Sequence, residues 1–308
     1  MITTFLTALG VVLIMLLYAV PGFLLVKSRL VLESSISAFA KLLMYVCSPC
    51  LVFNSLTRNE FSSSLVKEML IAFAFIFLAF LIGLVAFLFV FKKKSDNVKY
   101  RIYNLATIFA NCAFMGVPVL EALFPDYPQA IAFSAMASLA LNILGWSVAS
   151  YIISRDKKYI SVKKILLNPA TIALAIAIPF FVFSIEIPTL IDGAIVLFAK
   201  MTTPLCMLIM GMRLACASFK KVFLAPSQYL IIAIKQVIVP LLTFLILLPL
   251  PIDERMKASI YILMACPVAS VVLSFSEMIG EGQESASSLV LLGTALSAIT
   301  IPVMSLLI

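Results

Sequence analysis

Two short segments of the sequence place a proline beside small and polar residues inside long apolar stretches. They are NCAFMGVP (Asn111–Pro118) and ACPVAS (Ala265–Ser270). Proline has no N–H and clashes with the carbonyl four residues earlier, so we expect the carbonyls of Phe114 and Leu263 to be released from their helices. Freed carbonyls suit a cation, and the N-terminus of the following half-helix suits an anion. The chemistry is therefore expected to lie in broken backbone.

Ionisable and amide side chains inside apolar segments are further candidates, because such groups are costly in a membrane. Lys235 lies inside an apolar run beside Gln236, where its ammonium either balances a substrate carboxylate or ties down freed carbonyls. Glu121 and Glu277 are candidates for coupling to a proton or sodium, or are simply solvated near a segment end. Asn142 either lines a cavity or makes an interhelical hydrogen bond.

Enzymatic chemistry is not indicated. The chain has no histidine, and its six cysteines show neither metal-site spacing nor an extracellular pairing pattern. It also lacks a P-loop, a cluster of carboxylates and a Ser–Lys pair. We expect no enzyme activity, no metal and no cofactor.

The elements that must position these groups follow from composition. The chain of 308 residues is 64% hydrophobic and 12% charged, far from the values of soluble domains. Its apolar runs are unbroken, which favours membrane-spanning helices over the alternating strands of a barrel. We predict an all-α membrane protein with ten transmembrane spans, at residues 3–26, 34–57, 66–91, 101–123, 128–153, 168–185, 188–216, 226–249, 255–279 and 285–308.

Basic residues between the spans predict the orientation. Fourteen lie in loops on one side and four on the other, and basic loops stay in the cytoplasm. Both termini are then expected outside. The same placement accounts for most of the net charge of +8, so no nucleic-acid partner is expected.

The two halves of the chain share features in the same order. Pro49 and Pro204 lie at matching depth in the second and seventh spans, and Pro118 and Pro267 interrupt the fourth and ninth. Five helices per half is an odd number, so the second half enters the membrane from the opposite face. We predict two inverted repeats, residues 1–154 and 168–308, joined by a cytoplasmic loop at 155–167.

The segment Asn111–Pro118 resembles the N-x-G-F-x-G-x-P signature of the auxin efflux carrier family, with Ala113 in place of its usual first glycine. This family includes bacterial carriers of the malonate type and plant PIN-type auxin exporters. Supporting similarities, in register along the chain, occur at Ser48–Leu51, Asn168–Pro169, Pro204–Leu214 and Ala265–Phe275.

The resemblance implies a fold in which the broken fourth and ninth helices cross. It implies a scaffold of spans 1, 2, 6 and 7, which also forms a homodimer, and a transport domain of spans 3–5 and 8–10. It further implies a bacterial inner-membrane protein. The candidate substrate-binding residues are then Asn111, Gly116, Pro118, Pro267, Ala269, Ser270, Lys235 and Asn142.

The leading functional hypothesis is a secondary carrier of small organic anions, such as dicarboxylates or auxin-like acids, that works by elevator-type alternating access in the lipid bilayer. The alternative is a sodium- or proton-coupled symporter of a larger amphipathic anion, of the bile-acid type.

Overall fold

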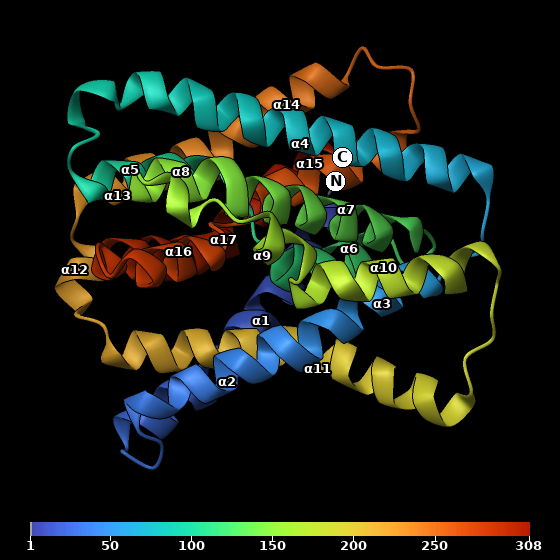
Figure 1. Cartoon of the computed structure of the whole chain (residues 1–308), viewed down its shortest axis with the longest axis horizontal. Helices are drawn as coiled ribbons and strands as arrows, with labels where there is room; N and C mark the ends of the chain where they lie inside the picture. The colour runs from blue at the N-terminus through green and yellow to red at the C-terminus, as the bar shows by residue number, and fades with distance from the viewer. Residues whose placement is uncertain (1) are drawn as a thin grey trace.

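The computed structural model describes residues 2–308, which form a bundle whose long helices mostly lie side by side (Figure 1). Eight helical stretches are long and apolar enough to cross a membrane. In these residues the only extended pairing is an isolated bridge between Ala110 and Val268. The predicted all-α membrane fold is therefore confirmed. The eight stretches are Ile2–Lys27, Glu33–Thr57, Ser63–Val90, Gln129–Ser154, Lys157–Val182, Thr189–Cys216, Pro226–Leu247 and Gln283–Leu307.

Four of these stretches consist of one α-helix, and four combine two. The continuous helices are α1 (Ile2–Lys27), α4 (Ser63–Val90), α11 (Thr189–Cys216) and α17 (Gln283–Met304). The others combine α2 (Ile36–Leu42) with α3 (Ser48–Thr57), α7 (Gln129–Leu144) with α8 (Ser150–Ser154), α9 (Val162–Leu166) with α10 (Pro169–Val182), and α13 (Pro226–Ala233) with α14 (Val239–Leu247). The short α12 (Phe219–Phe223) follows α11.

The fourth and ninth predicted spans are each divided, as expected. The fourth consists of α5 (Val98–Ile108), a wide π-helical turn η4 (Cys112–Gly116) and α6 (Val117–Leu123). The ninth consists of α15 (Glu254–Ala265) and α16 (Val271–Ile279). The structure therefore has eight helical stretches long enough to cross a membrane, and two divided segments where the fourth and ninth spans are predicted.

Prolines shape the helices in more than one way. Wide π turns end two residues before Pro49, Pro118 and Pro240, each of which is the second residue of the next α-helical segment. A missing N–H and the ring's clash with the preceding turn account for the widening. By contrast, Pro204 lies within the continuous helix α11. The matched pair of Pro49 and Pro204 therefore does not share one local structure.

Helices α1 and α11 pack against each other along much of their length, and two glycines permit their close approach. A Cβ atom on Gly22 would overlap the backbone of Leu208, and one on Gly211 would overlap the backbone of Ala19. Small residues let membrane helices approach until their backbones touch, which compensates for the absence of a hydrophobic driving force in lipid.

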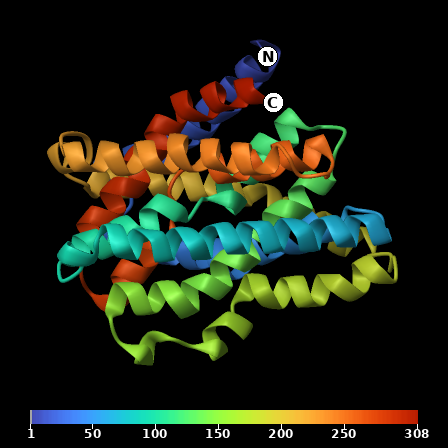
Figure 2. The same cartoon turned by 90° about the horizontal axis from the view of Figure 1, so that it is seen from above.

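Helix contacts fall into two main groups. One joins α1, α3, α10 and α11; the other joins α4, α5, α7, α15, α16 and α17 with α13 and α14. Helices α1 and α11 also contact α17 and η4, respectively, so the groups abut. In the turned view α4, in cyan, crosses the middle of the picture, and the two chain ends lie close together (Figure 2). The division into scaffold and transport domains stays a prediction.

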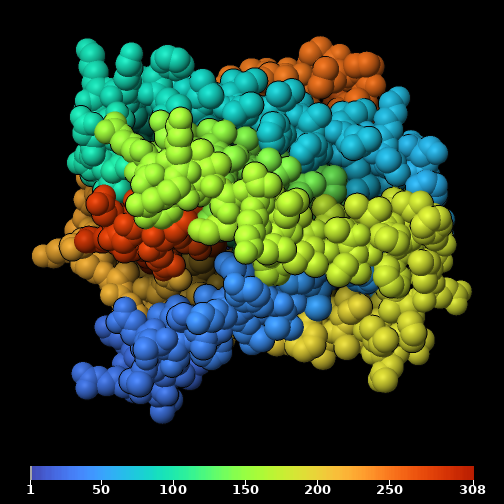
Figure 3. Space-filling view, in the orientation of Figure 1, coloured from blue at the N-terminus to red at the C-terminus, as the bar shows by residue number. Residues whose placement is uncertain are grey.

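The connection between the halves lies on the outside of the bundle. Residues 155–168 and α10 run across the front face, between α4 above and α2 below (Figure 3). The segments with lysine clusters at residues 92–94 and 220–221 lie together at one end, on the left in Figure 1. Which end faces the cytoplasm stays a prediction.

Candidate substrate site at the helix crossing

The two breaks in the fourth and ninth spans meet and pair through their backbones. The N–H of Asn111 donates to the carbonyl of Pro267 at 2.8 Å, and the N–H of Ala269 donates to the carbonyl of Phe109 at 2.9 Å. Backbone groups released inside a membrane need partners within the protein. Each break therefore supplies the partners that the other requires, and this pairing fixes where the half-helices cross.

The first break begins earlier than the sequence predicts. We expected it at Gly116 and Pro118, but α5 ends at Ile108 and the chain is extended before η4. Pro118 instead lies in the first turn of α6. The predicted release of the Phe114 carbonyl nevertheless has a counterpart, because this oxygen accepts a hydrogen bond from Thr203 Oγ1 of α11 at 3.0 Å.

A cavity of about 190 Å³ lies against the crossing. Four of the eight predicted substrate-binding residues line it: Asn111, Asn142, Ala269 and Ser270. The other four do not belong to its lining: Gly116, Pro118, Pro267 and Lys235. The crossing thus separates residues that face the cavity from residues that shape the backbone behind it.

Two half-helices begin at the cavity wall. Asn111 precedes η4 and Ser270 precedes α16. The first N–H groups of a helix have no intrahelical partner and carry partial positive charge. Asn111 is 5% exposed, and in residues 2–308 its side chain makes no hydrogen bond, while Ser270 Oγ is buried without a partner. The wall therefore offers donors that the described part of the chain leaves free.

Gly116 supports the crossing from behind. A Cβ atom there would meet Leu263 Cδ2 at 2.7 Å and Cys266 Sγ at 3.6 Å. The absence of a side chain allows η4 to approach α15, which keeps the two breaks within hydrogen-bonding distance.

Asn142 fulfils both of the roles considered for it. It lines the cavity, and it also accepts from Asn168 Nδ2 at 3.0 Å and donates to Thr171 Oγ1 at 3.1 Å. Asn168 in turn caps α10 by accepting from the N–H of Ala170 at 2.9 Å. This chain of amides joins α7 to α10 along one wall of the cavity.

Comparison with known families decides the kind of protein. A family model described as membrane transport protein matches residues 7–163 and 153–305, one match in each half of the chain. The chain belongs to this family. The resemblance to auxin efflux carriers is thereby confirmed at the level of the family, which is one of transporters and not of enzymes. No curated protein matches the chain.

Lys235 of this transporter is fully buried and serves the backbone of α15. Its Nζ donates to the carbonyl of Met264 at 2.7 Å. The neighbouring Gln236 donates to the carbonyl of Gly293 at 2.7 Å and accepts from Thr300 Oγ1 at 2.8 Å. These contacts match the tethering role that the sequence allowed for Lys235, since its ammonium lies at the C-terminal end of a broken helix.

Arg213 is the one charged side chain that lines the cavity in the described residues. It pairs with Glu277 of α16 at 2.8 Å, and the two side chains are 22% and 45% exposed. A wider cavity of about 720 Å³ begins at this pair and shares Ala40, Arg213 and Leu273 with the first. Arg213 and Glu277 therefore stand where the two spaces join.

The last predicted candidate, Glu121, lies away from the cavity, and the cavity region includes residues that the sequence did not indicate. Glu121 is exposed and outside the cavity lining. Thr203, Asn168 and Arg213 are not among the substrate-site residues that the sequence predicts. A basic residue within an apolar run was the available signal for Arg213, and the family resemblance at Asn168–Pro169 was the signal for Asn168, whereas Thr203 has no distinctive pattern.

Proposed function

We propose that this membrane transporter is a secondary carrier of small organic anions. Its substrates are carboxylates such as malonate, malate or indole acetate, selected by their size and charge. The observation that carries the proposal is the cavity at the crossing. Its described lining contains two half-helix N-termini and Arg213, and it contains no carboxylate.

Positive partial charges, free N–H groups and a guanidinium all favour an anion. Apolar side chains make up much of the remaining lining, for example Leu43, Val52 and Met210. A carboxylate attached to a small organic skeleton satisfies both kinds of surface. Ser138 and Asn142 add polar contacts on the same wall.

The size of the cavity favours the small anion over the alternative of a larger amphipathic one. Its volume of about 190 Å³ lies below the range of roughly 300–1,000 Å³ that is usual for drug-sized ligands. Of the two candidates for ion coupling, Glu277 forms an ion pair with Arg213. The transport assay below tests coupling to sodium or protons with and without the corresponding gradient.

For the transport step we propose an elevator motion. In this scheme α4–α8 and α13–α17 carry the substrate past a scaffold of α1–α3, α10 and α11. Four polar contacts between these helices cross this boundary: Thr203 to Phe114, Asn168 to Asn142, Asn142 to Thr171, and Arg213 to Glu277. Each is a single side-chain contact that can exchange partners as one group slides along the other.

The test is counterflow of labelled malonate, malate and indole acetate in proteoliposomes, with and without a sodium or proton gradient. A carrier gives saturable exchange, and a flux that rises linearly with concentration would mean a channel. Asn111→Ala should abolish saturable uptake without unfolding the protein, because no hydrogen bond of the described fold depends on its side chain.

A matched control is Asn54→Ala. Asn54 lies on α3, outside the cavity lining, and accepts only from Arg58. If Asn111→Ala binds and transports like the parent, the crossing is not the substrate site. If the parent and Asn54→Ala bind an organic anion that Asn111→Ala does not bind, but neither of them transports it, the site stands and the transport scheme fails.

The assembly and the orientation are parts of the same proposal. We propose a homodimer through the scaffold helices, in the inner membrane of a bacterium, with both termini outside. Mass measurement of the purified protein in detergent tests the dimer. Labelling of a cysteine introduced at Lys163 or at Glu60 from either side of the membrane tests the orientation, since these residues lie in loops of opposite predicted sides.

A further inference from the structure

A separate cavity of about 480 Å³ lies where α4, α5 and α8 meet, at the end of the bundle that carries the basic loops. Its lining is divided in two. Lys92, Arg101 and Arg155 supply positive charge, whereas Val85, Leu88, Phe89 and Tyr151 supply an apolar wall. It shares no lining residue with the cavity at the helix crossing.

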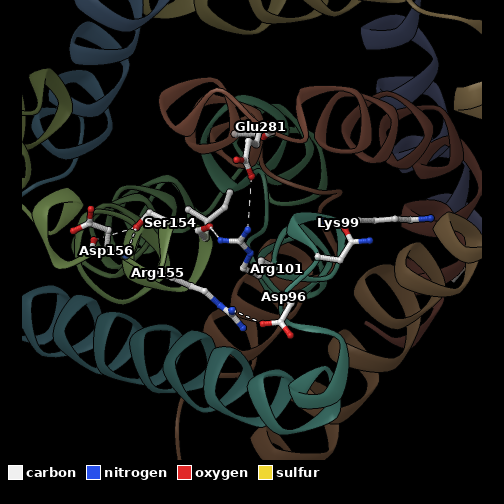
Figure 4. A network of polar contacts seen from close by, with 10 residues as sticks. Asp96, Lys99, Arg101, Ser154, Arg155, Asp156 and Glu281 are labelled. Atoms are coloured by element: carbon white, nitrogen blue, oxygen red, sulfur yellow. Dashed lines mark hydrogen bonds and ion pairs between the residues drawn. The ribbon is translucent and has the colours of Figure 1, made fainter.

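The charged side of this cavity is built from a fixed network (Figure 4). Arg101 is only 12% exposed, donates to the carbonyl of Ile153 and lies 3.8 Å from Glu281. Arg155 donates to Asp96 at 2.6 Å. These contacts join the starts of α5 and α17 to the end of α8, so the guanidiniums are held in place before any ligand arrives.

Two buried polar atoms of the lining lack a partner in residues 2–308. They are Nε of Arg101 and Oδ1 of Asn104, and the Asn104 side chain belongs to a residue that is 1% exposed. Lys92, which is exposed, makes no ion pair or side-chain hydrogen bond in the same residues. Nε of Arg101 and Nζ of Lys92 are therefore cationic donors that the described protein leaves free for an anion, whereas Oδ1 of Asn104 is an acceptor and needs a donor such as a hydroxyl.

Local charge is strongly positive despite the acidic neighbours. Between Lys92 and Arg101 the chain has five basic residues and one acidic residue, Asp96. The Asp96 side chain is 93% exposed, and that of Glu281 is 65% exposed. Water screens such exposed carboxylates well, so they offset the buried Arg101 only in part.

The apolar side of the cavity continues onto the lipid-facing surface of α4. Phe89 is 71% exposed, Leu88 is 38% exposed, and Tyr151 of α8 is 45% exposed. An occupant must therefore place an anionic group among the arginines and an apolar chain against α4. A free phosphate meets the first condition only.

We propose that this cavity binds the headgroup of an anionic phospholipid, with its acyl chains lying along α4. Basic pockets between membrane helices at the water boundary bind phosphate headgroups in this way. Because all lining residues belong to α4, α5, α8 and the segments next to them, the lipid would accompany that group of helices in any motion.

The test uses the full-length protein in detergent and measures lipid binding by native mass spectrometry and by the shift in apparent melting temperature. The probes are phosphatidylglycerol, phosphatidylcholine with the same acyl chains, and inorganic phosphate. Only phosphatidylglycerol should stabilise the protein substantially. The variant pair Lys92→Gln/Arg155→Gln should weaken its binding about 25-fold, since each basic residue near an anionic surface contributes about fivefold.

The single variant Lys92→Gln guards against misfolding, because the Lys92 side chain makes no hydrogen bond or ion pair in the described residues. Its affinity for the lipid should fall about fivefold, and Lys92→Arg should restore it. The matched control is Lys157→Gln/Lys163→Gln, which removes the same charge from exposed sites outside the cavity. Equal loss in the control would show a diffuse surface effect and overturn the proposal. Equal stabilisation by inorganic phosphate or by phosphatidylcholine would overturn it as well.

Discussion

Arg213 and Glu277 should affect anion binding in opposite directions. In the structure they pair at 2.8 Å where the small cavity opens into the wider one. If an organic anion takes the guanidinium, it must displace the carboxylate. Arg213→Gln should therefore weaken binding, and Glu277→Gln should strengthen it, because the competitor is gone.

The magnitudes follow from burial. A hydrogen bond to a charged group contributes about 1.5–3 kcal/mol, and the ion pair that must first be broken contributes about 0.2–1 kcal/mol because both partners are partly exposed. The net contribution of Arg213 is then about 1–2 kcal/mol, so Arg213→Gln should raise Kd about 5- to 30-fold. Glu277→Gln should lower Kd by at most about fivefold, the value of the competing pair.

Isothermal titration of purified protein with malonate, or with the best substrate from the uptake screen, gives both Kd values. The double variant should bind like Arg213→Gln, since Glu277 acts only through its partner. Lys221→Gln is the control, because Lys221 pairs with Glu284 at 2.8 Å in the wider cavity but is 59% exposed; its Kd should change less than about twofold. A change of the same sign in Arg213→Gln and Glu277→Gln would refute the exchange of partners.

Three further predictions concern stability. Lys235→Met should lower the apparent melting temperature in a thermal-shift assay, since the Met264 carbonyl loses its partner at a cost of about 1–3 kcal/mol. The same variant should change the Kd of the anion less than about threefold. A large loss of affinity with unchanged stability would contradict the tethering role of Lys235. Gly116→Ala should lower the free energy of unfolding by about 1–3 kcal/mol, because the added methyl group forces Leu263 of α15 to move. The same thermal-shift assay measures this loss, and an unchanged melting temperature would contradict the close approach of η4 to α15. Gly211→Ala should destabilise the contact of α1 with α11, whereas Gly193→Ala in the same helix has open space and should be neutral or better; equal effects would refute the contact.

The long helices could be predicted because their signal is local. The apolar run predicted at residues 66–91 appears as Ser63–Val90, and the run at 188–216 appears as Thr189–Cys216. A continuous stretch of apolar residues has no other low-energy structure in lipid, where every backbone group needs a partner nearby. The interruption of the fourth and ninth spans was predictable for a similar reason, since proline removes a backbone donor wherever it occurs.

The form of the breaks could not be predicted, because it depends on contacts between distant residues. Helix α5 gives way to extended backbone before Asn111, well ahead of Pro118, because Asn111 finds the carbonyl of Pro267 in the other half of the chain. The pair of Arg213 and Glu277 has the same origin. The residues adjacent to Arg213 and Glu277 in the sequence do not indicate that these two side chains pair.

The crossing also explains why the proposed ligand is an anion rather than a cation. A broken helix exposes two ends of opposite partial charge, negative at the end of α15 and positive at the start of α16. Lys235 already supplies a cation to the negative end through the carbonyl of Met264. The positive end at Ser270 faces the cavity, where the described lining contains no carboxylate to neutralise it. The protein therefore completes one end of the break with its own side chain, and the end that it leaves for a ligand is the one that an anion completes.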